Sequence, residues 1–70
     1  MRYSDARLAE MRQQLADLKT EHRDLDHALD LLQQAPYVDQ LRIRRMKKRK
    51  LVLKDMIAYI ENALLPDQPA

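Results

Sequence analysis

Hydrophobic residues recur along the chain at alternating intervals of three and four positions, in two separate runs. The first run has eight positions, of which one is polar: Leu8, Met11, Leu15, Leu18, His22, Leu25, Leu29 and Leu32. The second has seven positions, again with one polar member: Ile43, Met46, Lys50, Leu53, Ile57, Ile60 and Leu64. This repeat aligns its members along one side of an α-helix, as in a coiled coil. Each run, called a seam below, therefore predicts one amphipathic helix.

The first predicted helix spans about residues 5–34. Ser4 or Asp5 can cap its start, because a short polar side chain accepts a hydrogen bond from a free N–H of the first turn. No Gly or Pro interrupts the sequence before Pro36. The helix therefore has a clear start and no internal break.

The second predicted helix spans about residues 37–65. Pro36 suits its first turn, where a missing N–H costs nothing, and Asp39 then lies near the positive end of the helix dipole. Pro66 ends this helix, because the residue before a proline is pushed out of the helical region. Residues 66–70 are expected to form a disordered tail.

Only a few residues separate the two predicted helices, and a connection this short makes them antiparallel neighbours. The fold class is all-α: a single antiparallel two-helix hairpin over residues 1–65. Facing positions are expected to have residue numbers that add up to about 72 to 75. This alignment places Leu25 near Met46 or Lys50, and it places His22 in the same layer as Lys50 or Leu53.

A second apolar stripe runs along the second helix beside its seam. Its members lie on an arc of about 60° at 100° per residue: Val52, Met56, Tyr59 and Ala63. The first helix offers no matching stripe except Ala28 and Leu31, close to the turn. We therefore expect an interface with a second copy, giving a dimeric four-helix arrangement or a larger oligomer. Alternatives are a groove for a partner protein's helix, or tolerated exposure. The candidate interface residues are Val52, Met56, Tyr59, Ala63 and Leu31.

The chain length supports the expectation of association. A core built from 70 residues rarely supplies more than about 3–5 kcal/mol of net stability. The sequence has no Cys, which rules out disulfides and thiolate metal sites. The longest apolar-rich stretch, residues 51–65, is interrupted by charges and is shorter than the roughly 20 residues of a membrane span. A cytoplasmic location and the absence of a membrane span are expected.

Seven Lys or Arg residues lie between positions 42 and 50. In an antiparallel hairpin they face Asp24, Asp26 and Asp30, so inter-helix pairing explains part of this charge. The remaining surplus near the turn could bind a polyanion such as nucleic acid, although the charges surround the helix and do not form a one-sided stripe. The candidate polyanion-binding residues are Arg42, Arg44, Arg45, Lys47, Lys48 and Arg49.

Single residues give little reason to expect catalysis. His22 occupies a seam position, where a polar residue typically fixes the alignment of paired helices, while a pH switch or ligand role is the alternative. His27 lies about 140° away around the helix, so the two imidazoles cannot share a metal on one face. Lys50, in the other seam, is expected to cover apolar residues with its stem and keep its ammonium in water. No nucleophile with a neighbouring base is evident, so we expect neither enzymatic activity nor a cofactor.

Two stretches resemble the YdcH-like family of small bacterial proteins of unassigned function. The stretch "HRDLDHALDLL", residues 22–32, is similar to the family's H-x-x-L-D pattern, and "RRMKKRKLVLKDMI", residues 44–57, is similar to its basic K-K-x-K-L-x-L-K-D-E-I segment. The resemblance covers about residues 18–62 and implies a helical hairpin in a bacterial cytoplasm. It transfers no catalytic residue. Met56 stands where the family usually has an acidic residue, and this widens the apolar stripe.

The leading hypothesis from the sequence is a small, non-enzymatic, self-associating interaction or scaffold protein. The alternative is a nucleic-acid-associated protein that uses the basic segment 42–50.

Overall fold

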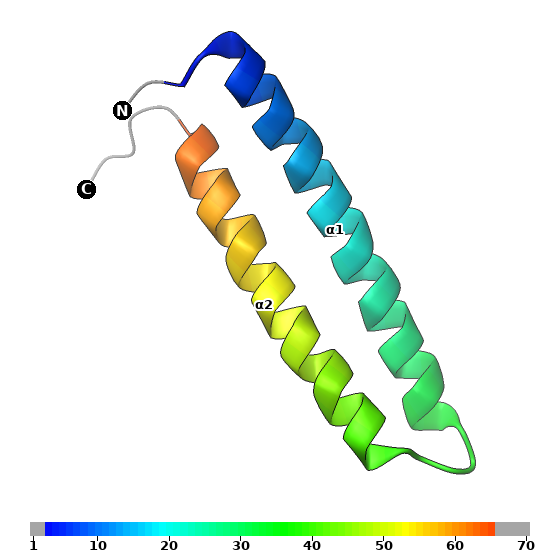
Figure 1. Ribbon diagram of the computed structural model, residues 1–70. Coiled ribbons are helices and arrows are strands. Elements are labelled where there is room, and N and C mark those ends of the chain that lie inside the picture. The colour runs from blue at the N-terminus through cyan, green and yellow to red at the C-terminus, as the bar shows by residue number, and fades with distance from the viewer. Residues whose placement is uncertain (1–2, 66–70) are drawn as a thin grey trace.

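Two long helices form an antiparallel hairpin in the computed structural model, which describes residues 3–65 (Figure 1). Helix α1 spans Asp5–Gln34 and helix α2 spans Gln40–Leu64. The helices run side by side, and the molecule measures 50 × 26 × 15 Å. The predicted all-α hairpin is therefore confirmed. The predicted disorder of residues 66–70 falls outside the described residues.

The start of α1 is capped by Ser4, one of the two residues proposed for this role. Its Oγ accepts a hydrogen bond from the backbone N–H of Arg7 at 3.1 Å, and Asp5 follows in the first turn. At the other end, Ala35 has an extended backbone and its N–H donates to the Leu32 carbonyl. This conformation agrees with the restriction that Pro36 imposes on the residue before it.

Helix α2 begins at Gln40, three residues later than predicted. Pro36 therefore lies in the connection and not in the first helical turn, so that expectation was wrong. The physical reason is capping: Asp39 Oδ1 accepts a hydrogen bond from the Arg42 N–H at 3.1 Å. A helix starting at Pro36 would have Ala35 as its cap, and Ala cannot accept such a bond from its side chain. The other end of α2 agrees with the sequence, because the chain leaves the helix at Leu65.

The core of the hairpin consists of the two seams. Every one of the fifteen seam positions is buried or half-buried. Leu53 is the most deeply buried, with 0% of its surface exposed, and it forms a cluster with Met11, Leu18 and Ile60. The alternating 3-4 spacing therefore identified the buried side of each helix.

Ion pairs connect the helices on either side of this core. Lys19 Nζ lies 3.4 Å from Glu61 Oε2, and Arg49 Nη2 lies 2.9 Å from Glu21 Oε1. Lys50 and Asp26 form a third pair. The residue numbers of these pairs add up to 80, 70 and 76, around the predicted range. Exposed pairs contribute only about 0.2–1 kcal/mol each. Their main effect is to favour this alignment over others.

Truncating Leu53 should strongly destabilise the hairpin. Leu53→Ala removes a fully buried side chain and is expected to lower the free energy of unfolding by about 2–5 kcal/mol. Urea unfolding followed by circular dichroism, at one fixed protein concentration, measures the change. Leu51→Ala is the matched control, because Leu51 is exposed on the same helix and its loss should change stability by less than about 0.5 kcal/mol. An equal loss of unfolding free energy in the two variants would contradict the assignment of Leu53 to the core.

Acid should weaken the hairpin through Asp26. The hydrogen bond and positive charge of Lys50 lower the pKa of this carboxyl, with a smaller contribution from His22. The pKa of Asp26 is lower in the folded state than in the unfolded state. The stability that ionised Asp26 contributes is therefore fully present above the unfolded-state pKa, and it is lost as pH falls through the folded-state pKa. We expect the melting temperature of Asp26→Asn to fall less than that of the wild type between about pH 5 and about pH 2. Asp24→Asn should behave like the wild type, and an unchanged acid response in Asp26→Asn would disprove the linkage.

Candidate functional site

An apolar surface follows the outer side of α2 in its C-terminal half. Val52, Met56 and Tyr59 are exposed there, and Tyr59 keeps 74% of its surface in solvent. Ala63 is half-buried and packs against the hairpin core. We call these four residues the α2 apolar face. A single hairpin therefore leaves Tyr59 largely uncovered, whereas Val52 and Met56 keep 42% and 37% of their surface exposed.

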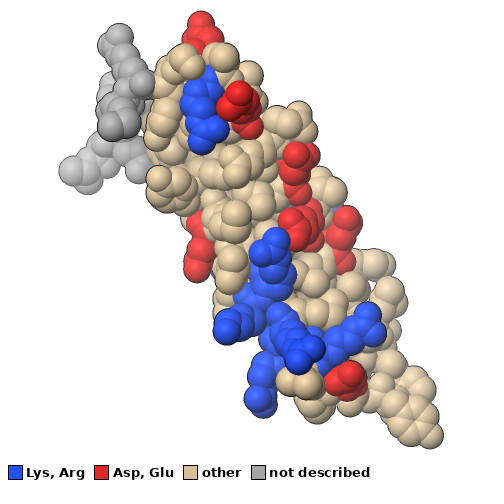
Figure 2. All heavy atoms as spheres, viewed as in Figure 1, with Lys and Arg blue, Asp and Glu red and all other residues tan. Residues whose placement is uncertain are grey.

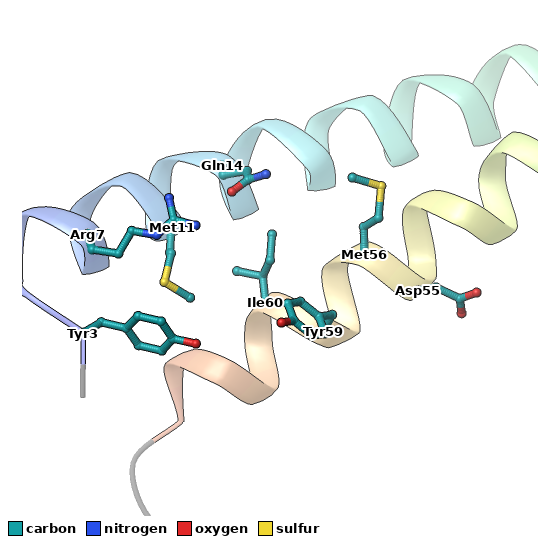
Figure 3. Close-up of a pocket in the computed structure, with 8 residues that line it drawn as sticks. All are labelled: Tyr3, Arg7, Met11, Gln14, Asp55, Met56, Tyr59 and Ile60. Carbon is teal, nitrogen blue, oxygen red and sulfur yellow. The ribbon is translucent and has the colours of Figure 1, made fainter. Parts of the chain in front are cut away.

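A groove of about 370 Å³ lies beside this face, between the start of α1 and the C-terminal half of α2 (Figure 3). Met56 and Ile60 extend from α2 toward α1, whereas Asp55 points away from it. Polar groups come from Arg7, Gln14 and Asp55, and the other lining residues are Tyr3, Met11, Met56, Tyr59 and Ile60. The groove extends the α2 apolar face toward α1 and gives it a concave part.

Leu31 does not join this surface. It is exposed, but it lies in the last turns of α1, next to the connection. In the antiparallel hairpin that position is at the opposite end of the molecule from Tyr59 and Ala63 (Figure 1). The sequence analysis grouped Leu31 with the α2 residues because all of them are apolar. In the antiparallel fold, Leu31 lies close to the turn and away from Tyr59 and Ala63.

The basic segment lies at the turn end of the molecule, where Lys and Arg side chains gather in Figure 2. All six candidate residues of this segment are exposed. Arg49 pairs with Glu21, and the neighbouring Lys50 pairs with Asp26. Within residues 3–65, the other five cations have no carboxylate within 4.0 Å: Arg42, Arg44, Arg45, Lys47 and Lys48. Inter-helix pairing therefore accounts for only the C-terminal end of the basic segment.

The connection carries an exposed apolar group that the sequence analysis did not single out. Tyr37 is 92% exposed and Leu41 is 57% exposed, with Val38 between them also open to solvent. We call these three residues the hairpin tip. The sequence signal was available, since two large apolar residues follow Pro36 in a segment too short to fold back on itself.

The two polar seam residues lie together, as predicted. His22 and Lys50 line one shallow groove with Lys54 and Ile57, and Lys50 reaches outward to Asp26. The Nε2 atom of His22 is buried and has no hydrogen-bond partner among the described residues. Over residues 3–65 there is no cluster of three or more His, Cys, Asp or Glu side chains suited to a metal ion. The same part of the chain has no helix with the length and apolar character needed to cross a membrane.

The comparison with known proteins gives one family. The model described as "Protein of unknown function (DUF465)" matches residues 15–61, which include most of both helices and the connection. No curated protein and no solved structure shows significant similarity to the chain. The matched region contains His22, Leu25 and Asp26 and the whole basic segment, on which the resemblance rested. The chain therefore belongs to this family, the YdcH-like small helical proteins of unknown function.

Proposed function

We propose that the protein is a non-enzymatic interaction or scaffold protein that self-associates through the α2 apolar face. The observation that carries this proposal is the exposure of Val52, Met56 and Tyr59 on one side of a helix whose other apolar side is already buried. Fully burying such a side chain stabilises a protein by about 1.5–3 kcal/mol. A second copy that covers this face therefore offers a gain comparable to the whole stability of a small hairpin.

The amount of exposed surface supports the same proposal. One copy exposes 6071 Å² in total. A stable interface of ordinary size covers about 800 Å² on each partner. The hairpin therefore has enough spare surface for such an interface without any change in its fold.

A non-enzymatic role agrees with the state of the two aliphatic hydroxyl side chains in the described region, those of Ser and Thr. Ser4 Oγ caps α1, and Thr20 Oγ1 donates a hydrogen bond to the Ala16 carbonyl at 3.1 Å. Both hydroxyls therefore contribute to helix structure, and neither lies beside a histidine that could act as a base. The chain has no Cys to serve as an alternative nucleophile.

Nucleic-acid binding through the basic segment is the second candidate. Its support is the group of five exposed cations that lack an ion-pair partner within residues 3–65. A nucleic acid that binds these cations releases condensed counterions, and this release favours association. A base-stacking surface is less developed, because Tyr37 is the only aromatic residue near these cations.

Substitution of Met56 tests self-association. Met56→Glu places an unpaired carboxylate in the interface of both copies, and burying these charges should raise the dissociation constant at least about a hundredfold. Size-exclusion chromatography with light scattering, at tens of micromolar, should show an oligomer for the wild type and a monomer for the variant. Leu51→Glu is the matched control, because Leu51 is exposed on a different side of α2, and it should stay oligomeric. A wild-type monomer with normal helical content would refute the proposal.

A salt series tests the second candidate. If five cations contact phosphates, the logarithm of the binding constant for duplex DNA should fall against the logarithm of salt concentration with a slope of about −4 to −5. Fluorescence anisotropy with labelled DNA and structured RNA measures this slope. Arg44→Gln/Arg45→Gln should reduce it by about 2, whereas Arg12→Gln/Arg23→Gln, on α1, should leave it unchanged. Undetectable binding at low salt would remove this candidate.

A further inference from the structure

We propose that the turn end of the hairpin docks end-on against the surface of an anionic lipid bilayer. The hairpin tip would enter the headgroup region, and the five cations without ion-pair partners in the described chain would face the lipid phosphates. The proposal does not depend on self-association, because the tip lies at the turn, whereas the α2 apolar face begins midway along α2 and continues away from the turn (Figure 1).

The apolar part of this surface is the hairpin tip. Tyr37 is the most exposed large hydrophobic residue among those described, and Val38 and Leu41 continue the surface into the first turn of α2. None of the three belongs to the core cluster of the hairpin. Tyrosine is enriched where membranes meet water, because its ring is apolar and its hydroxyl remains hydrated. A bilayer interface can therefore accept this tip without any partner protein.

The charged part surrounds the tip. Two carboxylates lie near it: Asp39, whose Oδ1 accepts the Arg42 N–H as the cap of α2, and Asp30 on α1. Set against the five cations, they leave this end with a net charge of +3. Cations from residue 42 to residue 48 span about 9 Å of helix axis, which is close to the Debye length at physiological salt. Most of these cations therefore lie close enough to an anionic surface touched by the tip to be attracted to it.

The arrangement of the cations favours a plane over a nucleic-acid groove. Consecutive residues of a helix point in directions about 100° apart, so the five basic side chains are spread over an arc of about 220° of α2 and not along one side. A groove or a backbone requires a one-sided stripe, so only part of such a ring can reach it. A flat anionic surface that meets the end of the rod is within reach of long side chains from every side.

Fluorescence locates the contact. Tyr37→Trp introduces the only indole of the chain, and its emission should shift to the blue with vesicles of equal parts phosphatidylglycerol and phosphatidylcholine. Vesicles of phosphatidylcholine alone should give no shift. Leu51→Trp is the matched control, because Leu51 is also exposed but lies away from the tip and outside the α2 apolar face, and its emission should not respond to vesicles.

Vesicle co-sedimentation measures the two contributions separately. Arg44→Gln/Arg45→Gln should lower the partition coefficient about 25-fold, since each cation near an anionic surface contributes about fivefold. Leu41→Ser should lower it about tenfold. The controls Arg12→Gln/Arg23→Gln and Leu51→Ser make the same chemical changes away from the turn, and each should alter partitioning by less than about twofold.

Two results would overturn the proposal. One is the absence of binding to the anionic vesicles at low salt by a protein with normal helical content. The other is vesicle binding that Leu41→Ser does not weaken, with no shift in Tyr37→Trp and equal affinity for duplex DNA, which would make the turn a general polyanion site. Leu41→Ser should keep the oligomeric state of the wild type while losing vesicle binding, so failure of self-association and failure of lipid docking can be told apart.

Discussion

Two helices that pack only against each other can bury one stripe each, and this geometric limit governs the rest of the molecule. The contact between the two helices is filled by the buried core residues Met11, Leu18, Leu53 and Ile60. Any further apolar residue has no place inside, and it must remain in solvent or find another molecule. The α2 apolar face and the hairpin tip are both consequences of this limit. They differ in where they lie and in which charges surround them.

The two ends of the rod differ in charge. Ion pairs across the hairpin neutralise Lys19, Arg49 and Lys50 along the middle of the molecule, where acidic residues of α1 are available. Near the turn, α1 supplies few carboxylates while α2 begins with its densest run of Arg and Lys. The positive surplus therefore collects at the end that also exposes Tyr37 and Leu41. The opposite end carries the apolar face and its groove.

Membership of the YdcH-like family does not by itself decide what the protein binds. The matched region, residues 15–61, includes the turn with its cations and the part of α2 that carries Val52, Met56 and Tyr59. Both proposed surfaces therefore lie mainly within the segment that defines the family. Met46 and Met56 are positions at which this chain departs from the resemblance, and the change at Met56 adds apolar area to the face proposed for self-association.

The sequence by itself determined the two helices, their buried sides, their antiparallel pairing and the end of α2 before Pro66, because each follows from a local spacing or a local backbone restriction. It also identified the stripe through Val52 and Tyr59. Only the tertiary structure decided that Arg49 and Lys50 are the paired members of the basic run, and that Leu31 lies far from the α2 apolar face. These outcomes depend on which side chains from distant parts of the chain meet across the hairpin, and spacing along one helix does not contain that information.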